Sequence, residues 1–82
     1  MELKEVNAII KVGAVFRGSN IQPQWFIWEN RKYQIKEINY TWRDRRGAEE
    51  LFCFAVTDDI NNYEISFNAK RVNWLLDKVC TA

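Results

Sequence analysis

The first quarter of the chain alternates in a way that suits an extended strand and not a helix. From position 6 to position 17 every second side chain is apolar, so these side chains share one face of a strand. That face carries Val6, Ala8, Ile10, Val12, Ala14 and Phe16. A strand of this length usually bends, and Gly13 is the natural position for a β-bulge or for the close approach of another part of the chain. The sequence therefore predicts a long first strand that bends near its middle.

Four more segments show the same period of two and are separated by turn residues. They are residues 24–29, 32–42, 49–57 and 63–67. Pro23 precedes the first of them, as expected for a residue that cannot donate to a strand ladder. In the segment 32–42 the apolar parity switches at Lys36-Glu37, which predicts a second bulge. Residues 43–48 are mostly charged and indicate a loop.

The last segment, residues 69–80, fits two structures. Val72, Leu75, Leu76 and Val79 would share one face of a helix, whereas Val72, Trp74 and Leu76 would share one face of a strand. Asn68 is a plausible helix N-cap, but residues 68–71 also suit a hairpin turn. Periodicity alone leaves a final strand and a short helix open.

Short turns between successive strands predict one all-β domain over residues 1–82. We expect an antiparallel meander of five or six strands, curled into a small barrel or a strongly bent sheet. The chain has no cysteine-rich framework, so its core must come from large side chains. Most of its twelve aromatic residues are therefore expected to fill the core.

The complete lack of histidine limits the chemistry of the chain. It excludes a histidine general base, a Ser-His or Cys-His relay and a Cys₂His₂ zinc site. The three glycines are isolated, so there is no glycine-rich phosphate loop. Cys53 lies in the apolar run 51–56 and is expected to be a buried, inert thiol, while Cys80 is near the end. We expect no enzymatic activity, no metal, no cofactor and no small-molecule ligand.

Cellular location follows from what the sequence lacks. No apolar run approaches the roughly 20 residues that a membrane helix needs. The start, residues 1–5, has no basic region followed by an apolar one, as a signal peptide would. We therefore expect a cytoplasmic protein that does not bind membranes.

Three apolar motifs carry a resemblance to a known group of proteins. They are Ala14-x-Phe16, Ile21-x-Pro23-x-x-Phe26-x-Trp28 and Arg31-x-Tyr33-x-Ile35-x-x-Ile38. The pattern resembles a family of small bacterial proteins of unknown function, and it extends from about Val12 to Val79. The resemblance implies a small all-β fold whose closing segment, Trp74-x-Leu76-x-x-Val79, is a strand. It also implies a link to DNA repair, and it transfers no catalytic residues.

One candidate site combines basic and aromatic residues. Arg43, Arg45 and Arg46 follow Tyr40 and Trp42 closely in the sequence. Single-stranded nucleic acid is bound by such a combination, with charge for phosphates and ring faces for bases. The net charge of only +1 argues against strong, sequence-independent binding. This pattern predicts weak binding of single-stranded nucleic acid.

The other candidate site is apolar. Trp25 and Trp28 are three residues apart, so a strand places them on opposite faces and one of them needs a cover. An exposed aromatic ring beside Ile27, or at Trp74, would mark an interaction surface. Our leading expectation is therefore a small interaction module that binds a protein partner or a second copy of itself through Trp25, Ile27 and Trp74.

Overall fold

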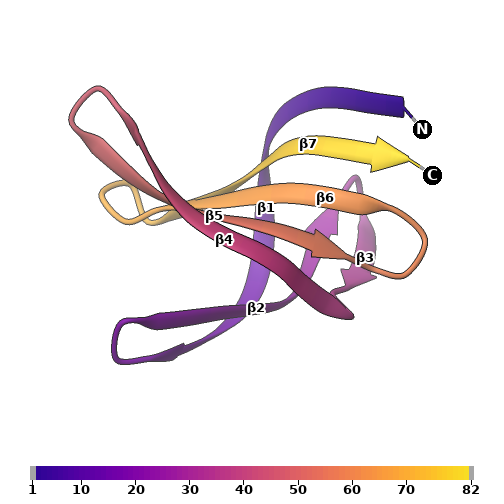
Figure 1. Cartoon of the computed structure of the whole chain (residues 1–82), viewed down its shortest axis with the longest axis horizontal. Coiled ribbons are helices and arrows are strands. Elements are labelled where there is room, and N and C mark those ends of the chain that lie inside the picture. Colours follow the sequence, from indigo (N-terminus) through magenta and orange to yellow (C-terminus); the bar gives the residue numbers. More distant parts are fainter. Residues whose placement is uncertain (1, 82) are drawn as a thin grey trace.

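The computed structural model describes residues 2–81, and these residues form a single sheet of seven antiparallel strands (Figure 1). The strands are β1 (Glu2–Arg17), β2 (Asn20–Trp28), β3 (Arg31–Gln34), β4 (Glu37–Arg46), β5 (Glu49–Thr57), β6 (Asn62–Asn68) and β7 (Asn73–Thr81). Their order in the sheet is β3-β2-β1-β7-β6-β5-β4. The all-β meander is confirmed, but the strand count of five or six was too low.

Strand β1 holds the two halves of the sheet together because it pairs on opposite edges along its length. Residues 2–10 pair with β7, and residues 11–17 pair with β2. The register shifts once between Glu5 and Ala8, where Asn7 has a φ of 53°, and again between Gly13 and Ala14. The register shift predicted at Gly13 is confirmed, but the extra residue is Gln24 of β2, and the Trp25 indole approaches Gly13 closely. The two shifts bend β1, so β2 and β3 fold back over β5 and β6 (Figure 1).

The segment expected as one strand over 32–42 is two strands, β3 and β4. Backbone pairing breaks at residues 35 and 36, where the apolar parity changes. The Ile35 N–H donates to the Gln24 carbonyl at 3.0 Å, and the Lys36 N–H donates to the Thr57 carbonyl at 2.8 Å. This segment therefore leaves the β2 edge and joins the β5 edge within one residue. The bulge predicted at Lys36-Glu37 is instead a break between two strands. The register of β4 against β5 shifts further on, between Ile38 and Tyr40.

The structure corrects the prediction of a loop at residues 43–48 and decides between strand and helix for the last segment. The predicted charged loop is wrong at its start, because β4 continues to Arg46 and only Gly47 and Ala48 form the turn. Cross-strand partners for Arg43 through Arg46 on β5 explain the longer strand. Residues 73–81 form strand β7, so the helical alternative for 69–80 is excluded. No helix within residues 2–81 could span a membrane.

The sheet is strongly bent, and it is not closed into a barrel. The two edge strands, β3 and β4, are consecutive in the chain, yet neither pairs with the other. The first half of β2, residues 20–24, therefore faces β4 without a strand between them. We call this open region the seam.

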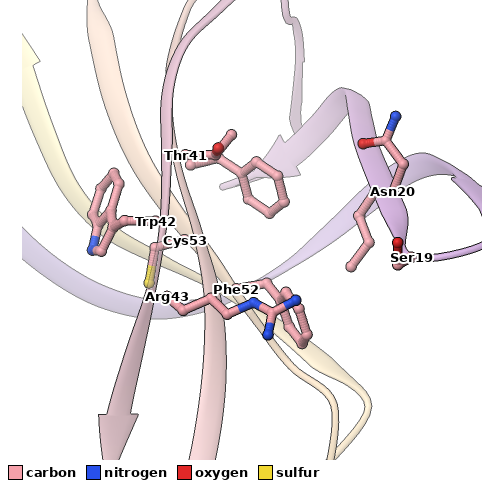
Figure 2. Close-up of a pocket in the computed structure, with 9 residues that line it drawn as sticks. Ser19, Asn20, Thr41, Trp42, Arg43, Phe52 and Cys53 are labelled. Carbon is pink, nitrogen blue, oxygen red and sulfur yellow. The ribbon is translucent and has the colours of Figure 1, made fainter.

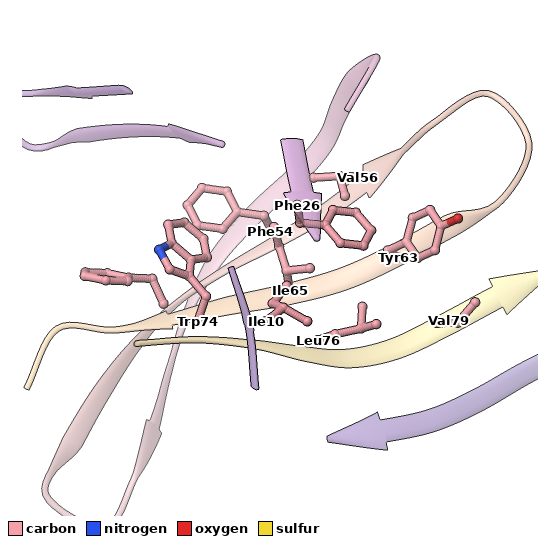
Figure 3. Packing of buried hydrophobic residues seen from close by; sticks show 10 residues of the cluster. Ile10, Phe26, Phe54, Val56, Tyr63, Ile65, Trp74, Leu76 and Val79 are labelled. Atoms are coloured by element: carbon pink, nitrogen blue, oxygen red, sulfur yellow. The ribbon is translucent and has the colours of Figure 1, made fainter. Parts of the chain in front are cut away.

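The core lies on the inner face of the bend, the face that carries Phe54, Ile65 and Leu76 (Figure 3). Phe26 reaches in from β2, is completely buried and contacts the ring of Tyr63 with centroids 5.1 Å apart. Trp74 lies between the rings of Phe54 and Phe67 at 5.7 and 5.0 Å. Burial of these large rings supplies the core of a chain whose two cysteines are both free.

Candidate functional site

The predicted nucleic-acid residues do not form one surface. Because β4 alternates, Arg43 and Arg45 lie on the inner face, whereas Tyr40, Trp42 and Arg46 lie on the outer face. Figure 2 shows the Arg43 and Trp42 side chains pointing in opposite directions. The five residues are therefore close in space but divided between two faces.

Two of the three arginines are also engaged within the protein. The Arg43 guanidinium lies 4.8 Å from the centre of the Phe52 ring and 3.9 Å from the Glu50 carboxylate. The Arg46 guanidinium is 3.6 Å from the Asp77 carboxylate. On the outer face the Tyr40 and Trp42 rings stack on each other at 5.5 Å, and Tyr40 is 65% exposed. Phosphate binding at this place would compete with existing ion pairs.

The three predicted protein-interaction residues are also placed differently from expectation. The expectation that Trp74 is exposed is wrong, since it is only 8% exposed and packs inside the core. Trp25 is half-buried because its indole covers Gly13 on one side and the Lys32 ammonium lies 4.8 Å above the ring on the other. Ile27 is half-buried as well. None of the three offers a freely exposed apolar face.

A groove of about 640 Å³ lies at the opposite end of the molecule from the β4–β5 turn. One wall is the β2–β3 hairpin with Trp28, Arg31 and Tyr33, and the other wall comes from β1, the β5–β6 turn and β7. The hairpin turn explains how the first wall forms. Glu29 and Asn30 both have positive φ, as a two-residue turn of type I′ requires, and this turn pairs Trp28 directly with Arg31. We call this site the basic groove.

Aromatic rings line the basic groove in continuous contact. Tyr33 stacks on Phe26 at 5.0 Å and meets the Tyr63 ring edge-on at 5.7 Å. The Trp28 ring lies 6.2 Å from that of Tyr33. Phe26 and Tyr63 are buried, whereas Trp28 and Tyr33 are only half-buried. Trp28 and Tyr33 are therefore the partly exposed rings of the groove, and Tyr33 is held by its contacts with Phe26 and Tyr63.

Lys4, Arg31 and Lys36 give the basic groove its charge. All three are exposed, and none of the ion pairs found among residues 2–81 involves them. Arg31 also lies 5.8 Å from the centre of the Tyr33 ring, which holds its charge beside an aromatic face. Lys32, Glu2 and Asp58 line the groove as well, so its four cations outnumber its two carboxylates.

Asp58, one of the two acidic residues that line the groove, is held by the β5–β6 turn, and the other is Glu2. One oxygen accepts the N–H groups of Ile60 and Asn61 at 3.0 and 2.8 Å, and the other accepts the Tyr63 hydroxyl at 3.0 Å. Burial raises the pKa of Asp58, but the hydrogen bonds from Asn61, Ile60 and Tyr63 outweigh it and hold the pKa below its usual value. Burial and the Asp58 carboxylate raise the pKa of Tyr63 to about 12. Asp58 is thus an ionised turn residue, and Tyr63 stays protonated at neutral pH.

The remaining reactive side chains are poorly suited to nucleophilic chemistry. Burial, with a further contribution from Asp77 and Asp44, raises the pKa of Cys53 to about 11, so its thiol is protonated at neutral pH. Ser66 is only 1% exposed. Within residues 2–81, no group of three or more cysteine, aspartate or glutamate residues could hold a metal ion. The lack of catalytic activity stays a prediction.

Sequence reasoning did not assemble the basic groove. Its residues come from four separate regions of the chain. The usable signal was the type I′ turn at Glu29-Asn30, since it fixes Trp28 and Arg31 as neighbours. Comparisons with family models, with curated proteins and with solved structures found no match. The resemblance to small bacterial proteins, and the DNA-repair link that it implies, therefore stay predictions.

Proposed function

We propose that this protein is a non-catalytic module that binds single-stranded nucleic acid in the basic groove. The observation that carries the proposal is the position of two partly open rings, Trp28 and Tyr33, beside three cations without ion pairs, Lys4, Arg31 and Lys36. Stacking on a ring stabilises a bound base by about 1–3 kcal/mol, whatever the base. Cations next to the rings meet the phosphates that connect such bases.

The groove also suits a single strand better than a duplex. A duplex keeps its base faces stacked inside, and it presents phosphates and groove edges to a protein. Only an unpaired strand can place a base face against Trp28 or Tyr33. With three cations we expect weak binding, with a Kd of about 10⁻⁴–10⁻⁶ M at physiological salt.

The earlier candidate surface at Tyr40, Trp42, Arg43, Arg45 and Arg46 is the natural competitor. It contains stacked rings and three arginines, but the ion pairs with Glu50 and Asp77 reduce its free charge. The two sites contain different tryptophans, which makes them separable by mutation. Trp28 lies in the basic groove and Trp42 in the competing surface.

The test is a titration of the protein with a ten-nucleotide oligothymidylate, followed by tryptophan fluorescence at low salt. Wild-type protein should be quenched. Trp28→Leu should remove most of the quenching and raise the Kd about 5- to 150-fold, the equivalent of about 1–3 kcal/mol. Trp42→Leu, the matched control, should bind like the wild type.

A second variant separates loss of binding from a folding defect in Trp28→Leu. Arg31→Gln changes an exposed side chain and should also weaken binding, while its thermal midpoint stays near that of the wild type. A larger loss of binding in Trp42→Leu than in Trp28→Leu would refute the proposed site. Absence of quenching in wild-type protein at low salt would refute the proposed function.

A further inference from the structure

The seam between β2 and β4 is bordered by two strand edges that have no partner strand. Strand β3 pairs only with residues 25–28 of β2, and the Gln24 carbonyl accepts the Ile35 N–H, so residues 20–23 keep a free edge. Strand β4 pairs with β5 on one side, and within residues 2–81 no strand pairs with its other side. The two edges meet at Ile35 and Lys36, whose N–H groups bond to the carbonyls of Gln24 and Thr57. From that point they diverge.

Two hollows occupy the seam along its length. The one near the meeting point has a volume of about 240 Å³ and is lined from both sides, by Gln22 and Pro23 of β2 and by Glu37 and Ile38 of β4. The other lies at the open end and has a volume of about 310 Å³ (Figure 2). Asn20 borders it on one side and Thr41 and Arg43 on the other, with Phe52 beneath the Arg43 guanidinium. The seam is thus an elongated slot with strand edges as its walls.

From these features we infer that the seam accepts an extended peptide segment of a partner protein, which adds to β4 as an antiparallel strand. An edge strand presents a row of backbone N–H and C=O groups that pair readily with another chain. Strand β4 is ten residues long and contains no proline, whereas the opposing edge of β2 contains Pro23, which cannot donate a hydrogen bond. The pairing edge is therefore β4, and β2 forms the far wall.

The two faces of β4 specify the side chains of this peptide. Beyond its bulge, β4 places Thr41, Arg43 and Arg45 on the inner face, and the stacked rings of exposed Tyr40 and half-buried Trp42 on the outer face. Side chains directly opposite each other on paired strands interact most strongly. A fitting peptide therefore alternates, with acidic residues facing the arginines and apolar residues facing the rings.

The existing contacts of β4 permit this exchange. The Arg43–Glu50 ion pair spans 3.9 Å between exposed side chains, so a peptide carboxylate can replace Glu50 at little cost. A second copy of β4 is a poorer occupant of the same edge. Residues 43–46 contain three arginines and one aspartate, so two copies paired over this stretch would repel each other.

The probe that tests the inference is the acetylated and amidated heptapeptide Glu-Val-Glu-Val-Glu-Val-Glu. Titrated into ¹⁵N-labelled full-length protein, it should shift the backbone amide signals of residues 40–46 and 20–24. We expect saturation below 1 mM. Arg45→Glu, a change at an exposed side chain, should weaken binding at least fivefold. Arg31→Glu, the matched control in the basic groove, should leave the affinity unchanged.

One control peptide separates strand addition from charge attraction. The same heptapeptide with every residue N-methylated keeps its charge but loses the N–H donors that would face β4, and it should not bind. Equal binding of the N-methylated peptide would refute strand addition. Absence of shifts at 2 mM, or shifts confined to the basic groove, would overturn the inference. A dimer in sedimentation equilibrium whose β4 amide signals change with protein concentration would also overturn it, since a second copy would then hold the edge.

Discussion

Replacement of Gly13 by alanine should destabilise the protein severely, although alanine normally suits a strand better than glycine. Gly13 pairs directly with Trp25 across β1 and β2. A Cβ added at Gly13 would overlap the Trp25 indole, whose ring lies directly on the glycine backbone. The indole must therefore lift away from β1.

The size of the effect follows from the indole surface that would be exposed again. A tryptophan buries about 150–250 Å², and lifting the ring exposes roughly half of that, or about 100 Å². At about 25 cal/mol per Å² this costs about 2.5 kcal/mol. Alanine loses less backbone entropy on folding than glycine does, and this offsets about 0.5–1 kcal/mol of the cost. The net loss is about 2 kcal/mol, which lowers the thermal midpoint of a domain this size by about 8–16 °C.

Urea denaturation followed by far-UV circular dichroism measures this loss, and a double-mutant cycle assigns its cause. Gly13→Ala should cost almost nothing in a Trp25→Leu background, because leucine cannot cover the glycine as the indole does. Gly47→Ala is the control for a purely conformational cost. Gly47 has a φ of +61° and open space around it, so its loss of about 1 kcal/mol should persist in the Trp25→Leu background. A Gly13→Ala protein as stable as the wild type, or additive effects of Gly13→Ala and Trp25→Leu, would refute the steric reasoning.

Three other perturbations have defined outcomes. Val72 is 75% exposed and has a φ of 53°, which is unfavourable for a β-branched residue. Val72→Asn should therefore raise the free energy of unfolding by about 1 kcal/mol. An unchanged or lower thermal midpoint would contradict this. Asp58→Ala should cost about 1–3 kcal/mol at pH 7 through lost hydrogen bonds of the β5–β6 turn. Because the folded-state pKa of Asp58 is lowered, its ionised form stabilises the fold above the ordinary carboxyl pKa and this stabilisation is lost as pH falls through the folded value. The stability gap between wild type and Asp58→Ala should therefore shrink as the pH falls below the ordinary carboxyl pKa of about 4, and a gap that widens would contradict the assignment. Lys36→Gln should reduce the slope of log Kobs for oligothymidylate against log salt by about 0.7, the contribution of one phosphate contact on a single strand, and an unchanged slope would remove Lys36 from the interface.

Much of the fold was predictable because strand periodicity is a local property. The alternation in β1, the register shift at Gly13 and the clean fifth segment at residues 63–67 all depend on neighbouring side chains. The division of residues 31–46 between β3 and β4 depends instead on two different partner strands, and no local pattern reports that. The extension of β4 to Arg46 was missed for a related reason, since charged residues resemble a loop until a cross-strand partner on β5 is known.

The candidate sites were harder to predict than the fold because exposure depends on tertiary contacts. Trp74 shows strand periodicity whether it is covered or not, and only the folded chain places it between Phe54 and Phe67. The arginines at 43, 45 and 46 are adjacent in the sequence, but strand alternation divides them once β4 is known to include them. The basic groove requires β1, the β2–β3 hairpin and the β5–β6 turn to meet, and this depends on the bend in β1.

Photocrosslinking tests the proposed basic groove most directly. An oligothymidylate with single 5-iodouracil substitutions, irradiated in complex with wild-type protein and analysed by peptide mass spectrometry, reports which aromatic side chains contact bases. Stacking in the basic groove predicts adducts at Trp28 and Tyr33, which added salt should suppress. Adducts at Tyr40 and Trp42 without any at Trp28 or Tyr33 would contradict the proposal.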